Sequence, residues 1–243
     1  MSVYFITGPE GSGTTALLRA LTNHPEAVKG DADRYGHHYL RGVPGAQLIP
    51  AALMCTTRAG AFALADPAAA ARTLRDNAAA LYAAQPACRA IFFKYSTPAL
   101  RPPLWPVFLP LFELSDFRVI VIRRRPADSI YSAFRRFYGK GARDVRGLLA
   151  AMRAYRNAGR HIRWQLERSP RARCRELTYE HLVAEPDAAL RALFAFAGLE
   201  YRSIDGLLPE RRFSDENGKW KGALRRALTG GRERPAGRRS IPS

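Results

Sequence analysis

Residues Val3–Leu21 read VYFITGPEGSGTTALLRAL, and this stretch decides the fold. The first five residues are β-branched or aromatic, which predicts a buried strand. The segment from Gly8 to Gly13 favours neither a strand nor a helix. From Thr14 onward the leucines recur at helical spacing, so the stretch predicts a strand, a glycine-rich loop and a helix. Backbone N–H groups of such a loop, at the positive end of the helix dipole, can bind a phosphate or a sulfate.

The loop has the spacing of a Walker A motif but lacks the lysine of that motif. Gly8 and Gly13 stand in the pattern G-x-x-x-x-G, which a lysine and a serine or threonine should follow. Here Thr14 and Thr15 follow instead. The loop is therefore suited to an anion and poorly equipped for hydrolysis of ATP or GTP. The alternative reading is a glycine turn that binds nothing.

Length and composition favour one globular domain. The chain has 243 residues, of which 47% are hydrophobic, so it can bury a full core. No uncharged apolar run is long enough to span a bilayer, and no secretory signal precedes the first strand. The three cysteines are scattered, which indicates neither a disulfide framework nor a metal site. We therefore predict a cytoplasmic protein.

The net charge of +18 is unusually large, and part of it lies in the C-terminal tail. Glycine, proline and arginine dominate residues 229–243, which predicts a domain over residues 1–228 followed by a basic, disordered tail. A positive charge attracts nucleotides, acidic substrates and nucleic acid. A non-enzymatic nucleic-acid-binding protein is therefore one alternative that charge alone leaves open.

Strands and helices alternate along the rest of the chain. This alternation predicts an α/β fold of three layers with a central, mostly parallel sheet. The G-x-x-x-x-G loop after the first strand makes the predicted fold a P-loop-like nucleotide-binding one. We read Val28–Pro50 as a long irregular loop. Further strands are expected at Ala90–Tyr95, Arg118–Ile122 and Cys174–Tyr179, and further helices at Pro67–Ala84, Asp128–Tyr138, Val145–Arg168 and Pro186–Ala197.

Polar or cationic side chains follow each predicted strand. They include Lys94, Arg124 and Tyr179, in addition to the glycine-rich loop. In a parallel sheet the carboxyl ends of the strands meet at one edge, where ligands bind. We therefore expect these residues to lie around one site.

Together these segments resemble the sulfotransferase family. The sequence GSGTT at Gly11–Thr15 is similar to the last five positions of the family's P-K-S-G-T-T loop. Arg124, Pro126 and Ser132 match its R-x-P-x-x-x-x-x-S motif. Two later segments also resemble the family: LTYEHLVAEPDAALRALFAFAGLEY at Leu177–Tyr201 and GKWK at Gly218–Lys221.

The resemblance implies transfer of a sulfuryl group from 3′-phosphoadenosine 5′-phosphosulfate (PAPS) to a hydroxyl or amine, without a metal, a specific nucleic acid or a membrane span. The implied contacts of the 5′-phosphosulfate are with Gly11, Ser12, Gly13, Thr14 and Thr15. Arg124 and Ser132 would bind the 3′-phosphate, and Tyr179 would lie against the adenine. Lys219 and Lys221 would belong to a loop over the cofactor.

The chain departs from the family pattern in two places. Gly11 replaces the lysine of the loop, which leaves Lys94 to stabilise the leaving group, and Ser96 stands where many members have a histidine base. The resemblance then favours Asp33 as the base, with His38 or His37 as alternatives. Two further readings remain, a nucleotide-binding protein with impaired catalysis and a P-loop kinase.

Overall fold

Strand β1 (Ser2–Gly8) lies near the middle of the sheet, between β6 (Ala90–Ser96) and β7 (Phe117–Arg123). Both neighbours run parallel to it. The computed structural model describes residues 2–32, 38–40, 54–56, 62–64, 67–96, 117–139 and 144–203. The parallel arrangement brings the loop that follows β1 to the same edge as the ends of β6 and β7.

The sheet has six strands in the order β3-β2-β6-β1-β7-β8 within these residues. β2 (Ala27–Ala32) pairs in parallel with β6, and β8 (Cys174–Thr178) pairs in parallel with β7. β3 (His38–Leu40) is antiparallel to β2 at the edge. A separate hairpin joins β4 (Met54–Thr56) to β5 (Phe62–Leu64). The predicted α/β class with a mostly parallel sheet is confirmed.

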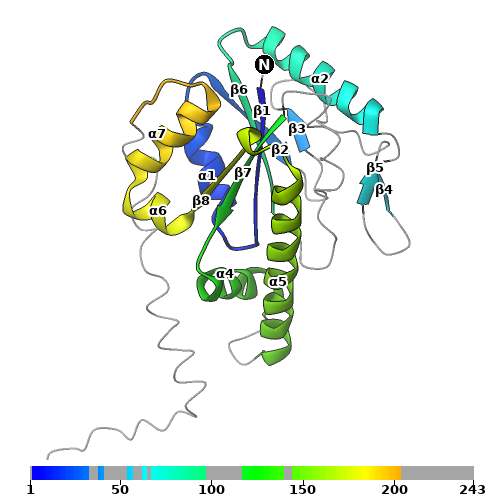
Figure 1. Ribbon diagram of the computed structural model, residues 1–243, viewed down its shortest axis with the longest axis vertical. Helices are drawn as coiled ribbons and strands as arrows, with labels where there is room; N and C mark the ends of the chain where they lie inside the picture. Colours follow the sequence, from blue (N-terminus) through cyan, green and yellow to red (C-terminus); the bar gives the residue numbers. More distant parts are fainter. Residues whose placement is uncertain are drawn as a thin grey trace, which may run out of the picture. The chain divides into compact units, whose positions relative to one another are not determined.

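The helices follow the strands as expected for this class. Figure 1 shows α1, α6 and α7 on one side of the sheet and α5 on the other. The helical segments are α1 (Thr14–Leu21), α2 (Pro67–Ala84), α4 (Pro126–Ala133), the π-helical turn η2 (Phe134–Tyr138), α5 (Val145–Arg168), the 3₁₀ turn η3 (Arg171–Arg173), α6 (Tyr179–Ala184) and α7 (Pro186–Ala197).

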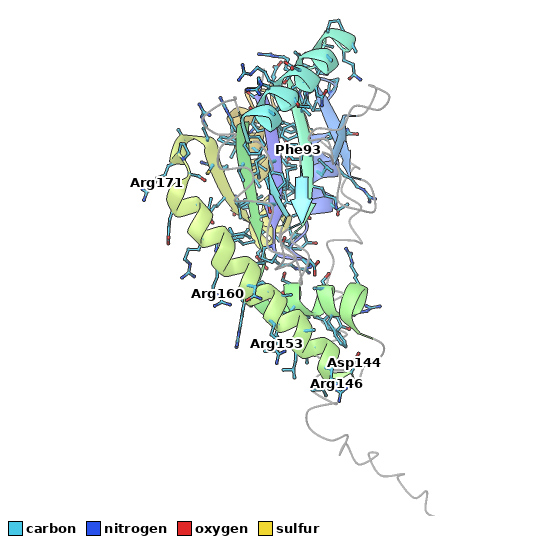
Figure 2. The ribbon with its side chains drawn as sticks, turned by 90° about the vertical axis from the view of Figure 1, so that its right-hand side faces the viewer. Phe93, Asp144, Arg146, Arg153, Arg160 and Arg171 are labelled. Atoms are coloured by element: carbon cyan, nitrogen blue, oxygen red, sulfur yellow. The ribbon has the colours of Figure 1, made fainter. Side chains whose placement is uncertain are left out.

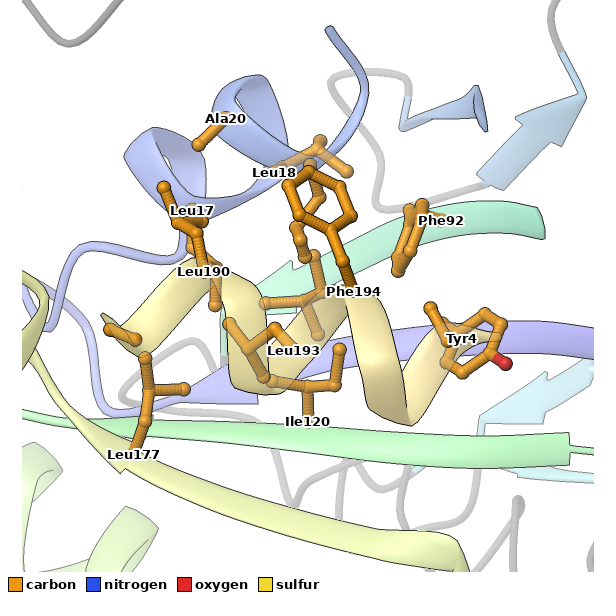
Figure 3. Close-up of a cluster of buried hydrophobic side chains, with 14 of the residues drawn as sticks. Tyr4, Leu17, Leu18, Ala20, Phe92, Ile120, Leu177, Leu190, Leu193 and Phe194 are labelled. Atoms are coloured by element: carbon orange, nitrogen blue, oxygen red, sulfur yellow. The ribbon is translucent and has the colours of Figure 1, made fainter. Parts of the chain in front are cut away.

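The main hydrophobic core lies between the sheet and helices α1 and α7 (Figure 3). Side chains at alternate positions of β1 and β7 enter it, and the ring of Tyr4 stacks on Phe92 at 4.9 Å between centroids. The helices contribute apolar residues at helical spacing, among them Leu17, Leu18, Leu190, Leu193 and Phe194. Burial of this face therefore fixes α1, and with it the end of the loop that precedes α1.

The opposite face of the sheet has an aromatic core. Phe5 lies 5.0 Å from Phe93 and 6.2 Å from Phe117 between ring centroids. The hydroxyl of Tyr82 in α2 lies 3.0 Å from the carbonyl oxygens of both Ser2 and Arg89, which share its single hydrogen. Two faces packed in this way complete the three predicted layers.

Three expectations about the elements were wrong in part. Val28–Pro50 is not irregular throughout, because β2 and β3 occupy part of it. The register pairs Val28 with Ile91 of β6. The segment AVKGDA therefore forms a strand by pairing with the edge of β6, although its own strand propensity is weak. Tyr179 begins α6 rather than ending a strand, since Thr178 accepts a hydrogen bond from the amide of His181 and caps the helix. The helix expected at Asp128 starts at Pro126 and ends in the turn η2.

Residues 229–243 lie outside the described residues, so the division at 228 remains a prediction. Within the described residues, no helix combines the length and the apolar character that a membrane span requires.

The core between the sheet and α7 can be tested at Phe194, whose side chain is fully buried. Phe194→Ala leaves a cavity and should lower the free energy of unfolding by about 3–5 kcal/mol in urea denaturation. Val183→Ala is the matched control, because Val183 is 37% exposed. The control should change stability by less than about 0.5 kcal/mol. Equal losses in the two variants would contradict this assignment of the core.

Candidate functional site

The loop between β1 and α1 is built on two glycines in the left-handed region. Gly11 has φ 80° and Gly13 has φ 101°. Gly13 is also the N-cap residue of α1, and no side chain caps this helix end. The first amides of a helix have no partner within the helix, so the first turn of α1 offers N–H donors at its positive end. The predicted anion-binding nest therefore has the expected backbone.

Arg124 joins this loop to the end of β7. Its Nη1 donates a hydrogen bond to the carbonyl oxygen of Gly11 at 3.1 Å. The guanidinium carbon lies 4.3 Å from the centre of the Tyr179 ring, a cation–π distance. The Nε of Arg124 is buried and has no hydrogen-bond partner among the described residues. The guanidinium group is thus held from two sides, and its buried Nε–H has no partner among the described residues.

Tyr179 packs directly against the loop. A Cβ added to Gly13 would lie 2.5 Å from Cδ2 of the Tyr179 ring. Only a glycine leaves room for this contact, and the positive φ of Gly13 excludes most other residues independently. Three strand ends, those of β1, β7 and β8, therefore meet through Gly13, Arg124 and Tyr179.

Helix α4 packs against Gly11 from the other direction. A Cβ added to Gly11 would collide with the carbonyl oxygen of Ser129 and lie 2.9 Å from the Cβ of Ser132. The hydroxyl of Ser129 donates to the carbonyl oxygen of Glu10 at 2.8 Å. Ser132 is thereby placed beside the loop, as predicted. The same contacts leave no space for a side chain at position 11.

Lys94 brings a cation to the loop from β6. The parallel register pairs Lys94 with Ile6, near the carboxyl end of β1. Its Nζ donates to Oγ1 of Thr15 at 2.8 Å. Thr14 and Ser12 are buried beside Thr15, and the Oγ of Ser12 has no partner among the described residues. A buried hydroxyl of this kind can still bind an anion.

Three residues that support the site were missed in the sequence. Besides Ser129, Tyr155 of α5 donates its hydroxyl to the carbonyl oxygen of Arg124 at 3.5 Å. Burial raises the pKa of the Tyr155 hydroxyl above its ordinary value. The positive charge of Arg123 opposes this shift, and the negative charge of Glu180 adds to it. Glu180 accepts a hydrogen bond from the amide of Arg125 at 2.8 Å. Ser129 and Glu180 stand near residues that the sequence did single out, whereas no sequence signal marked Tyr155 as a neighbour of the site.

The remaining predicted site residues cannot be placed. Asp33, His37, Lys219 and Lys221 lie outside the described residues, and His38 is described only as the first residue of β3. Among the described residues, no group of three or more His, Cys, Asp or Glu side chains could hold a metal ion. The structure thus brings together Gly11, Ser12, Gly13, Thr14, Thr15, Lys94, Arg124, Ser132 and Tyr179.

The family follows from a comparison that spans most of the chain. Residues 4–203 match the sulfotransferase family, so the chain belongs to that family and is a transferase enzyme. The matched range includes the glycine-rich loop, Lys94, Arg124, Ser132 and Tyr179. No curated protein sequence matches the chain.

Solved sulfotransferases share the fold at low sequence identity. A sulfotransferase domain from the curacin biosynthetic pathway is 17% identical, with 85% of this chain and 76% of that chain covered and a TM-score of 0.53. A sulfotransferase from Alicyclobacillus acidocaldarius is 17% identical, with 96% and 99% covered and a TM-score of 0.51. A domain from the Synechococcus PCC 7002 olefin synthase is 18% identical, with 90% and 82% covered and a TM-score of 0.52. These likenesses support the fold.

The packing at Gly11 predicts that the lysine of the family motif cannot be restored. Gly11→Lys should lower thermal stability and affinity for 3′-phosphoadenosine 5′-phosphate, because the new Cβ would strain the backbone and push α4 away. Gly159→Lys is the control, since a Cβ there meets nothing within 4 Å. A Gly11→Lys variant that melts like the control and binds the nucleotide more tightly would contradict the observed packing.

Proposed function

We propose that this enzyme transfers a sulfuryl group from PAPS to a hydroxyl or an amine of an acceptor. The observation that carries the proposal is the position of Arg124, bonded to Gly11 and stacked on Tyr179. The cationic side chain of Arg124 thereby lies between the anion-binding loop and the aromatic ring of Tyr179. The site thus combines an anion-binding loop, a cation outside that loop and an aromatic surface. A nucleotide with phosphate groups at both its 3′ and 5′ positions needs these three features together.

The residues of the site fit this donor. The amides of the first turn of α1, with Ser12, Thr14 and Thr15, would hold the 5′-phosphosulfate. Arg124 and Ser132 would bind the 3′-phosphate, because a guanidinium forms charge-assisted hydrogen bonds to phosphate oxygens. Two buried polar atoms that have no partner in the described part of the chain, Oγ of Ser12 and Nε of Arg124, support this reading. Tyr179 would face the adenine, and Lys219 and Lys221 would cover the cofactor.

The donor supplies an activated sulfuryl group, whose S–O bond to the 5′-phosphate breaks as the acceptor atom bonds to sulfur. Lys94 neutralises the negative charge that grows on the leaving phosphate oxygen, and its hydrogen bond to Thr15 fixes it beside the loop. A base takes the proton of the acceptor, and we assign this role to Asp33, with His38 or His37 as alternatives. Catalysis then depends mainly on positioning and on cationic stabilisation.

The proposal requires no metal and no nucleic acid. The acceptor is a glycan, a lipid or a small metabolite with a hydroxyl or an amine, and we place the protein in the cytoplasm. A second candidate function is nucleotide binding without transfer. It is favoured by the packing of α4 on Gly11, which excludes a lysine from the loop.

The 3′-phosphate assignment can be tested by replacing Arg124. Arg124→Ala should weaken binding of 3′-phosphoadenosine 5′-phosphate by about 2–4 kcal/mol, because one partner of a desolvated charge pair is removed. Binding of adenosine 5′-phosphosulfate, which has no 3′-phosphate, should change much less. Isothermal titration calorimetry with both ligands measures the difference.

The neighbouring arginine provides the control for this experiment. Arg123 pairs with Glu176 at 2.7 Å, and both side chains are well exposed. Arg123→Ala should therefore leave both affinities nearly unchanged. Equal losses for the two ligands in Arg124→Ala would show that Arg124 only shapes the loop, and would refute its role at the 3′-phosphate.

The role of Lys94 can be tested with the same donor. Lys94→Ala should lower turnover by about 10²–10³, the effect of removing one preorganised charge stabiliser. Turnover is followed as formation of 3′-phosphoadenosine 5′-phosphate from PAPS, with a panel of hydroxyl and amine acceptors. Lys29→Ala is a control that removes a lysine from the next strand, β2. Tight binding of the donor by the wild type without turnover on any acceptor would favour the second candidate function.

A further inference from the structure

The outer face of α5 carries five exposed arginines, Arg146, Arg153, Arg156, Arg160 and Arg163. We call this row the arginine ridge. Figure 2 shows Arg146, Arg153 and Arg160 following one another along the helix. The nucleotide site uses none of these side chains, so its chemistry does not explain them.

The arginine ridge lies opposite the side of α5 that packs on the protein. An α-helix turns by about 100° per residue, which places the ridge on the far side from the buried residues. Those residues are Ala151, Ala154, Ala158 and Ile162, each at most 7% exposed. The ridge therefore faces away from the core along most of the helix.

Ion pairs within the described part of the chain do not neutralise the positive charge of the arginine ridge, and the carboxylate of Glu167 continues its spacing only at the C-terminal end of α5. None of its five arginines forms an ion pair with a described carboxylate. Arg160 donates to Oδ1 of Asn157, a neutral group, at 2.6 Å. Like charges three or four residues apart destabilise a helix, so this face is unfavourable for the isolated protein. An external anionic partner would remove that cost.

Two apolar side chains extend the same face at its N-terminal end. Val145 is 66% exposed and Leu149 is 46% exposed, which is unusual for large aliphatic residues in this structure. Leu149 lies between Arg146 and Arg153, so arginine and leucine share one stripe. Phosphate groups alone would gain nothing from these apolar contacts.

The spacing of the stripe is that of a helix-packing seam. Residues 146, 149, 153, 156, 160 and 163 alternate steps of three and four, as positions a and d of a heptad do. A second helix laid along this seam would meet one side chain at each step. A second copy of the same face would bring arginine against arginine, which disfavours self-association through it.

We propose that the arginine ridge, with Val145 and Leu149, docks an acidic amphipathic helix of another protein. Carboxylates at the facing positions would pair with the guanidinium groups, and an apolar residue at one end would cover Leu149. The proposal is independent of the sulfuryl-transfer chemistry. Tyr155, which contacts the backbone of Arg124, is turned about 100° around the helix from Arg156, toward the buried side of α5. The docked helix would therefore leave the nucleotide site uncovered.

The test uses the full chain and two synthetic helical peptides of the length of α5, 24 residues. The first peptide carries glutamates at heptad spacing on one face, with a leucine placed to meet Leu149. The second has the same composition with the glutamates spread around the helix. Fluorescence anisotropy should give an affinity at least about tenfold higher for the first peptide.

Two charge-reversal variants locate the contact. Arg153→Glu/Arg160→Glu should weaken binding of the first peptide at least about tenfold. Arg72→Glu/Arg175→Glu changes the net charge equally at exposed arginines of α2 and β8, and should have a much smaller effect. Leu149→Ala should also lower the affinity for the first peptide, and this loss of affinity should persist in high salt. Melting temperature and nucleotide affinity report that each variant is folded.

The competing partners are tested in parallel with a single-stranded DNA oligonucleotide and with anionic lipid vesicles. Equal affinity for the two peptides would overturn the proposal. Tighter binding of the oligonucleotide or of the vesicles than of the first peptide would also overturn it, if that binding is lost in Arg153→Glu/Arg160→Glu and unchanged in Leu149→Ala. That result would assign the arginine ridge to phosphate groups instead.

Discussion

The hydrogen bond from Arg124 to the carbonyl oxygen of Gly11 is the constraint on which the rest of the site depends. It ties the residue after β7 to the loop after β1, two points that are far apart in sequence. Gly11 accepts this bond in a left-handed conformation, which a residue with a side chain rarely adopts. Tyr179 then closes the arrangement from the end of β8, stacking on Arg124 and contacting Gly13. The parallel sheet makes this possible, because only parallel strands deliver three consecutive strand ends to one edge.

The contacts around the loop explain why Gly11 replaces the lysine of the family motif, a difference for which the sequence alone offered no reason. In the sequence, Gly11 stands where the family motif has a lysine, and the loss of that positive charge weakens the case for catalysis. In the structure, the position is filled by the approach of α4, whose Ser129 bonds to Glu10 and whose Ser132 lies against Gly11. In place of a lysine side chain, the loop has a tight contact with the helix that bears Ser132, one of the two predicted 3′-phosphate residues. Lys94, on Thr15, is the remaining lysine at the loop among the described residues.

Much of the fold could be predicted because its signals are local. The residues of Val3–Thr7 and Arg118–Ile122 have high strand propensity, so each run predicts a strand from its own sequence. The glycines between Gly8 and Gly13 predict the loop in the same way. β2 could not be predicted in this way, since AVKGDA has weak strand propensity and forms a strand because the edge of β6 is open to it. The supporting contacts of Ser129, Tyr155 and Glu180 were equally invisible. A serine or a tyrosine on a helix has the same local pattern whether it faces solvent or another loop, and only the packing of α4 and α5 decides which.

The alanines on the buried side of α5 have a consequence for how the sequence can diverge. Ala151, Ala154 and Ala158 offer only methyl groups, so along this part of α5 the helix packs closely on its neighbours without large interlocking side chains. A larger residue at any of the three could not be absorbed by a change of rotamer, and the whole helix would have to move outward as a rigid rod. Tyr155 would leave the carbonyl of Arg124 in the same movement. Evolutionary drift at these alanines is therefore limited by the geometry of the contact between Tyr155 and Arg124, which none of them touches.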